Sequence, residues 1–92
     1  MVTIDSFSGN TYRGAKYLVT INANTGANVL YDARELLVIH DGINPYITEY
    51  GQLSANLLGD FTTVVNGGNF DLRFTPTYSN TVIRTVKTLL LL

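Results

Sequence analysis

The residues of this 92-residue chain that could carry acid–base or metal chemistry gather around one turn. His40 is the only histidine, Asp41 follows it, and Glu49 is expected to face it across a hairpin. An imidazole and two carboxylates can move protons or bind a metal ion. Because metal sites usually need three or four converging ligands, the favoured interpretation is structural. Asp41 is expected to accept backbone hydrogen bonds in the turn, and His40 to satisfy a partner at a strand end.

Other enzyme motifs are absent from the sequence. There is no cysteine, no serine lies in a Gly-x-Ser-x-Gly elbow, and the lone histidine has no serine neighbour. The glycine-rich stretch Asn66-Gly67-Gly68-Asn69 lacks the following Lys and Ser/Thr of a phosphate loop, and it is interpreted as a turn. We therefore predict a protein that is not an enzyme and needs no cofactor or metal.

Tyrosines supply an alternative function. Six are present, and Tyr46 and Tyr50 in particular could stack on sugar rings while Asn and Asp side chains supply polar contacts. The alternative is thus a glycan-binding, lectin-like adhesion module. Tyrosine is also an ordinary strand residue whose ring packs while its hydroxyl stays hydrated, so both interpretations remain open.

Charge and hydropathy exclude two further classes. Six basic and seven acidic residues give a net charge of −1, and only 14% of residues are charged. Four bases could form a basic patch if their strands are neighbours, but without surplus positive charge we predict no nucleic-acid partner. They are Arg13, Lys16, Arg84 and Lys87. No apolar run approaches the roughly 20 residues of a membrane span, so membrane insertion is not expected.

The elements that position these residues are predicted to be strands. Thr, Val, Ile and aromatic residues are abundant, and turn-forming residues recur at short intervals. The expected strands are Val2–Ser8, Lys16–Asn22, Asn28–Asp32 leading into Glu35–His40, Tyr46–Tyr50, Phe61–Val65, Phe70–Phe74 and Thr81–Leu89. We interpret Gln52 to Leu58 as a connection. The fold class is therefore all-β, a single domain over residues 1–92 forming a small antiparallel β-sandwich of about seven strands, immunoglobulin-like in strand number.

Alternation along the strands predicts the core. Tyr17, Val19 and Ile21 share one face, and Phe70, Leu72 and Phe74 share another, with Asp71 and Arg73 pointing the opposite way. The run Leu36–Ile39 is apolar on both faces, which suits a central strand covered twice or one that buries its second face against another subunit.

The last strand runs into four leucines, Leu89, Leu90, Leu91 and Leu92. A leucine tetrad at a chain end is costly unless it is covered, since termini usually fray and prefer polar residues. Two explanations are open. Either the strand continues into its own core, or the leucines form a candidate interface with another subunit or partner.

The stretch Val38-Ile39-His40-Asp41-Gly42 followed by Tyr46-Ile47-Thr48-Glu49-Tyr50-Gly51 resembles a β-sandwich module of virion structural proteins from tailed bacteriophages, notably T4-like phages of marine bacteria. Further similarity follows in the same order, so the resemblance spans roughly residues 14 to 92. It is carried there by Leu58-Gly59-Asp60-Phe61, the Asn66-Gly67-Gly68 turn, Leu72-Arg73-Phe74-Thr75-Pro76 and the strand from Thr81 to Leu90.

The resemblance implies a structural protein of the virion without catalytic residues, such as a capsid decoration, tail or fibre-associated component. Modules of this kind usually sit within longer proteins, so the chain is either a small stand-alone protein or a domain of a longer one. The expected partners are copies of itself, a trimer being one symmetric arrangement, and other virion proteins.

Overall fold

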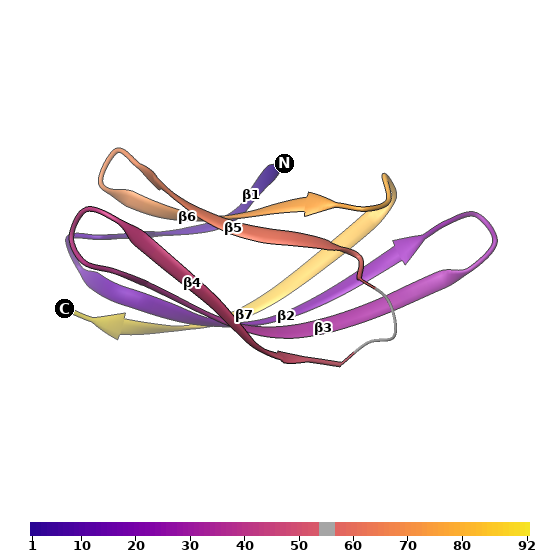
Figure 1. The fold of residues 1–92 in the computed structure, drawn as a ribbon, viewed down its shortest axis with the longest axis horizontal. Helices are drawn as coiled ribbons and strands as arrows, with labels where there is room; N and C mark the ends of the chain where they lie inside the picture. Colours follow the sequence, from indigo (N-terminus) through magenta and orange to yellow (C-terminus); the bar gives the residue numbers. More distant parts are fainter. Residues whose placement is uncertain (54–56) are drawn as a thin grey trace.

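The computed structural model describes residues 1–53 and 57–92, which form two antiparallel sheets packed face to face (Figure 1). The three-stranded sheet has the order β1-β6-β5, and the four-stranded sheet has the order β4-β3-β2-β7. The strand bounds are β1 Val2–Ser8, β2 Tyr12–Asn24, β3 Val29–His40, β4 Pro45–Gln52, β5 Gly59–Asn66, β6 Asn69–Pro76 and β7 Thr81–Leu91. The predicted seven-stranded, all-β sandwich is confirmed, and no helix occurs among the described residues.

The strand number matches an immunoglobulin domain, but the strand order is different. In immunoglobulin constant domains the first two strands are neighbours in one sheet. Here β1 pairs with β6, whereas β2 lies between β3 and β7 in the other sheet. The β2–β3 hairpin and the β3–β4 hairpin therefore build most of one layer, and the β5–β6 hairpin builds most of the other.

The bounds of β2 to β7 differ from those predicted. The second strand begins at Tyr12 rather than Lys16, because its register shift between Tyr12 and Gly14 lets pairing with β7 continue past the glycine. The two segments expected between Asn28 and His40 are one continuous strand, β3. The last strand continues to Leu91. The middle of the predicted Gln52 to Leu58 connection, residues 54–56, lies outside the described residues.

The turn of the β5–β6 hairpin shows why glycine is needed there. Gly67 and Gly68 have φ angles of 56° and 91°, a left-handed conformation that side chains with a Cβ rarely adopt. Asn66 and Asn69 close the ladder on either side of them. The two glycines therefore reverse the chain at little steric cost, as the sequence predicts.

The core lies between the two sheets and follows the period of two. On β2 the inward row of Ala15, Tyr17, Val19, Ile21 and Ala23 is fully buried. The facing row on β6, consisting of Phe70, Leu72 and Phe74, is at most 2% exposed. Both predicted inner faces are thus confirmed.

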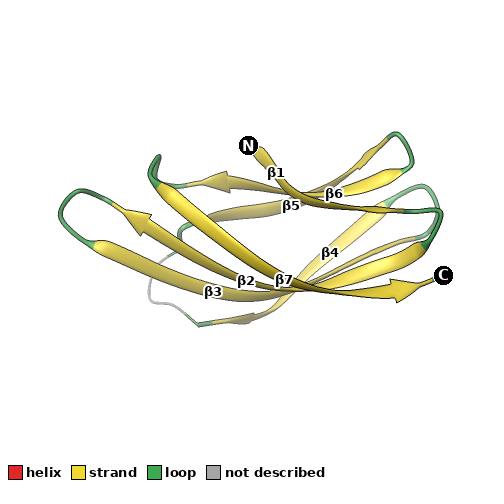
Figure 2. Ribbon diagram, turned by 180° about the vertical axis from the view of Figure 1, so that it is seen from behind, coloured by secondary structure: helices red, strands yellow, loops and turns green. Residues whose placement is uncertain are grey.

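The sandwich is elongated, with extents of 45 × 23 × 16 Å. Figure 2 shows that the hairpin joining β2 and β3 extends beyond the three-stranded sheet at one end. At the opposite end, the turns of β1–β2, β3–β4 and β5–β6 lie together (Figure 1). The four-stranded sheet is consequently the larger layer.

Candidate functional site

The outer face of the four-stranded sheet carries the main exposed apolar surface of the described chain. Directly opposite residues in antiparallel strands point to the same side, so the register defines this face. Leu18 lies between Val86 on β7 and Glu35 on β3, and Ile39 lies beside Tyr46 on β4. Leu18 is 49% exposed and Val86 67% exposed. We call the set Leu18, Leu37, Ile39, Tyr46, Val86 and Leu90 the apolar face.

The run Leu36–Ile39 has one buried side and one exposed side. It lies in β3, which has β4 on one side and β2 on the other. Leu36 and Val38 are buried in the core, while Leu37 and Ile39 point outward and are partly exposed. The sandwich itself covers only one side of this strand.

The outer face of the three-stranded sheet is mostly polar. Register pairing places Asp71 of β6 beside Ser6 and Val64, and Thr75 beside Asp60. Asp71 accepts hydrogen bonds from Asn66 and Arg73, each at 3.2 Å. Asp71 points away from the core as predicted, yet these neighbours leave it only 4% exposed.

The four terminal leucines are divided between core and surface. Leu89 packs against the core cluster, in register with Ala15. Leu90 belongs to the apolar face, and Leu91 and Leu92 are 73% and 59% exposed. The backbone N–H of Leu92 donates to the carbonyl oxygen of Thr11, which continues the alignment of this segment with β2.

The two candidate glycan-contact residues both lie on β4. Tyr46 is 53% exposed and its hydroxyl donates to Asp41 Oδ2 at 3.0 Å. This hydrogen bond raises the pKa of Tyr46. Tyr50 is 51% exposed, and the ammonium of Lys16 lies 5.8 Å from the centre of its ring. Both rings are therefore accessible on the same strand.

His40 is a buried structural residue. Its Nε2 lies 2.6 Å from the carbonyl oxygen of Tyr12, and its Nδ1 accepts the backbone N–H of Gly42 at 2.9 Å. These partners define a neutral ring with the proton on Nε2. The ring stacks on Phe70 with 4.2 Å between centroids, and the side chain is 3% exposed.

The expectation that Glu49 faces His40 is wrong. The register places Pro45 opposite His40 and Glu49 opposite Leu36. Asp41 turns toward its own loop, where its Oδ1 accepts the N–H groups of Ile43 and Asn44. Those backbone hydrogen bonds, that of Asn44 first, lower the pKa of Asp41 to about 2. Over residues 1–53 and 57–92, no three His, Cys, Asp or Glu side chains are grouped to hold a metal ion.

The four bases do not form one patch. Lys16 and Arg84 belong to the outer side of the four-stranded sheet. Arg13 donates to the carbonyl oxygen of His40, and Lys87 turns between the sheets to Asp5, with Nζ 2.9 Å from Oδ2.

A buried ion-pair cluster was not singled out from the sequence. Arg34 is 2% exposed and donates to Asp32 Oδ2 at 2.8 Å, to Glu49 Oε1 at 3.2 Å and to the carbonyl oxygen of Gly59 at 2.7 Å. Burial opposes the charge of Arg34, but the hydrogen bond and charge of Asp32, with Glu49, outweigh it and raise its pKa. Asp32 Oδ1 is buried and has no hydrogen-bond partner among residues 1–53 and 57–92. The alternation along β3 could have indicated this cluster. Asp32 and Arg34 point to the same side of the strand as Leu36, Val38 and His40.

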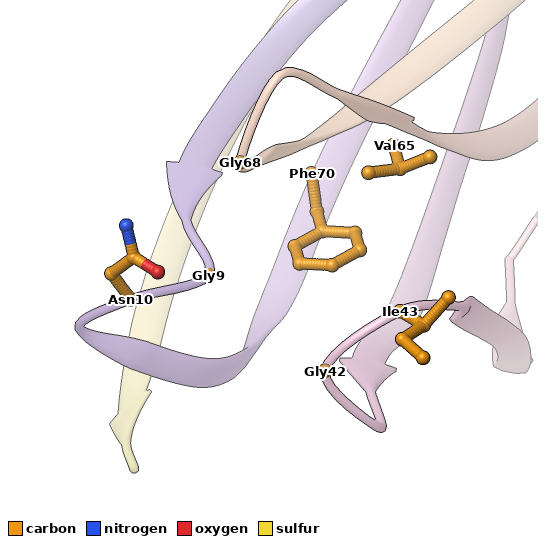
Figure 3. Close-up of a pocket in the computed structure, with 7 residues that line it drawn as sticks. All are labelled: Gly9, Asn10, Gly42, Ile43, Val65, Gly68 and Phe70. Carbon is orange, nitrogen blue, oxygen red and sulfur yellow. The ribbon is translucent and has the colours of Figure 1, made fainter.

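A hollow of about 340 Å³ opens at the end of the sandwich where three turns meet (Figure 3). It is lined by Gly9, Asn10, Gly42, Ile43, Val65, Gly68 and Phe70. None of these side chains is charged or titratable, and His40 is stacked against Phe70 rather than lining the hollow. The hollow therefore offers no acid, base or nucleophile for catalysis.

Comparison with known proteins adds nothing to these observations. No protein-family model, no curated protein and no solved structure matches this chain. In the described part of the chain, no helix is long and apolar enough to cross a membrane.

Proposed function

We propose that this chain is a non-enzymatic structural protein of a bacteriophage virion, and that it acts by associating with itself and with other virion proteins. The observation that carries the proposal is the apolar face of the four-stranded sheet. Monomeric proteins rarely leave a contiguous apolar patch of more than a few hundred Å² in water. The resemblance of residues 38–51 to virion modules of tailed phages supports the proposal that the protein belongs to a virion.

The mechanism of such a protein is assembly. Burial of apolar surface drives association without any chemical step, and symmetry lets identical copies hide the same surface on each. A capsid decoration, a tail component or a fibre-associated protein would each use the fold in this way. A closed homo-oligomer, a trimer being one such arrangement, would present further surfaces to neighbouring virion proteins.

Two measurements test the proposal. Light scattering over a range of micromolar concentrations should show a mass above 10.1 kDa, the mass of one chain. Mass spectrometry of purified phage particles should detect this chain among the virion proteins. A monomer at every concentration, or particles that lack the chain, would contradict the proposal.

The leucine segment gives a second test. Changing Leu90 and Leu91 to Ser should weaken association if their exposed side chains reach a neighbour. Leu89→Ser is the matched control, because this leucine packs on the core and its loss should lower the melting temperature. If the double variant lowers only the melting temperature, the leucine segment is not an interface.

A glycan-binding module is the second candidate, favoured by one observation. Tyr46 and Tyr50 are both half-exposed on β4, and Asp41 lies within hydrogen-bonding distance of Tyr46. An aromatic ring can stack on the C–H side of a sugar ring, and a neighbouring carboxylate can accept hydrogen bonds from the sugar hydroxyls. Specific binding on a glycan array that is lost in Tyr46→Ala or Tyr50→Ala, but kept in Tyr78→Ala, would favour this function over assembly.

A further inference from the structure

We infer that the apolar face is the contact between two copies of this chain, which pack with their four-stranded sheets face to face about a two-fold axis. The inference rests on the proposed function and names the surface and the partner that self-association would use. The contact would be centred on β2 and β3, the two inner strands of the sheet. Leu18 on β2 and Leu37 and Ile39 on β3 would contribute its apolar side chains, with Glu35 beside Leu18 and Lys16 beside Leu37.

The size of the face matches a stable interface. Four strands about 4.8 Å apart and about ten residues long, at about 3.3 Å per residue, cover about 630 Å² before side-chain relief is counted. A typical specific interface buries about 800 Å² on each partner. The whole outer face of this sheet is therefore about what one side of a dimer requires, and a smaller ligand would leave most of it wet.

The charges on the face favour a second copy. Within the four strands, the charged side chains that the register places on this side are Lys16, Glu35 and Arg84. Both signs are present and the excess is a single positive charge, so two copies would meet without a strong like-charge field. A strongly acidic or basic partner has no complementary field here.

The geometry of the face explains why the pairing would be two-fold. When one patch meets the identical patch, each contact occurs twice and the pair is closed. Sheets that pack face to face keep their strands within about 30° of each other and about 10 Å apart. The outward Leu and Ile side chains of the two inner strands suit such packing, and the pair would consist of four stacked sheets.

Sedimentation equilibrium of the full chain tests the inference. At high micromolar concentration the wild type should have the mass of two copies. Leu18→Lys and Val86→Lys should each raise the dissociation constant at least tenfold, because each removes an apolar contact and adds a positive charge near Lys16 or Arg84 on both copies. The matched control is Thr75→Lys, which places the same charge on the polar outer face beside Asp60 and should leave the mass unchanged.

Circular dichroism and the melting temperature confirm that each variant is folded. Val86 is 67% exposed on an edge strand, so its variant carries the test if Leu18→Lys fails to fold. Amide NMR shifts followed on dilution give an independent map. Changes at Leu37 and Ile39 support a face contact, whereas changes restricted to the outer edge of β7 would overturn it in favour of edge-to-edge pairing.

The outcomes separate this inference from the proposed function. A dimer that both lysine variants leave intact overturns the face-to-face contact while self-association stands. A trimer overturns the two-fold pairing, because an isologous contact closes with two copies. A wild type that stays monomeric at every concentration overturns the inference together with the proposed self-association.

Discussion

The two sheets differ in the side chains that they place on the side facing away from the core. Along β6, the middle strand of one sheet, the outward residues are polar and end in the Asp71–Arg73 pair. Along β3, an inner strand of the other, Leu37 and Ile39 point outward. Antiparallel sheets with one wet side usually alternate apolar and polar residues, as β6 does. The outer side of the four-stranded sheet instead places apolar residues among the charged residues Lys16, Glu35 and Arg84; they include Leu18, Leu37, Ile39 and Val86.

The difference separates stability from association. Residues between the sheets should control the free energy of unfolding, whereas residues on the apolar face should control the dissociation constant. The outer side of the three-stranded sheet should affect neither strongly. Substitutions can test this division directly, beginning with the largest expected effect.

Arg34→Ala should lower the free energy of unfolding more than the other substitutions. It leaves the carboxylate of Asp32 buried without its ion-pair partner, a change that typically lowers the free energy of unfolding by about 3–5 kcal/mol. Urea unfolding at low protein concentration measures this without a contribution from association. Arg84→Ala on the exposed side of β7 is the control and should change stability by less than about 0.5 kcal/mol. Equal effects of the two substitutions would refute the division.

Leu36 and Leu37 are neighbours on β3 that point in opposite directions, which makes them a matched pair. Leu36→Ala removes a fully buried side chain and should destabilise the fold by about 2–5 kcal/mol. Leu37→Ala should cost less than about 1 kcal/mol in the unfolding of the separated chain. The ranking should reverse when the dissociation constant is measured. If Leu36→Ala weakens association more than Leu37→Ala at concentrations where both are folded, the faces are wrongly assigned.

Salt should have a small effect on association. Raising NaCl from about 0.05 M to about 0.5 M screens exposed charges, but apolar burial does not depend on screening. We expect the dissociation constant to change by less than about threefold. A loss of association at high salt, measured by sedimentation, would indicate that charged residues rather than the apolar face hold the copies together.

The smallest effect concerns Asp41 in the β3–β4 turn, which holds Tyr46 of the apolar face through its hydroxyl. The pKa of this carboxyl is lowered from 3.8 to about 2, so its stabilising contribution is complete above pH 3.8 and is lost as the pH falls through about 2. The stability difference between wild type and Asp41→Asn should therefore shrink as the pH falls across this range. A carboxyl NMR titration checks the pKa, and a difference that does not vary with pH would contradict this role.

The fold class and core were predictable because they depend on local patterns. Alternation gave the buried rows of β2 and β6, and the paired glycines gave the turn between β5 and β6. The partner of β1 was not predictable, because β6 lies some sixty residues away and nothing in the sequence of β1 encodes that choice. The length of β2 was also underestimated, since the predicted strand begins at Lys16 whereas pairing continues through Gly14 to Tyr12.

The apolar face was predicted only in part. The two-sided composition of Leu36–Ile39 suited either a central strand covered twice or one that faces another subunit. The structure adds Leu18 and Val86, which lie on strands that only the register brings together. Alternation on β2 alone also places Leu18 opposite the core row of Tyr17 and Val19. What the sequence lacked was the neighbour relation, because isolated outward leucines are common and a contiguous set is not.

The cluster at Arg34 has a consequence for how the molecule opens. The guanidinium of Arg34 donates hydrogen bonds to a carboxylate on β3, to a second carboxylate on β4 and to a main-chain oxygen at the start of β5. It therefore contacts both layers, close to the point where the chain passes from one sheet to the other. These hydrogen bonds fix the position of one layer relative to the other at that point for as long as the guanidinium stays in place. Amide protons at the start of β5 and in the middle of β3 should then exchange with solvent in a single concerted event.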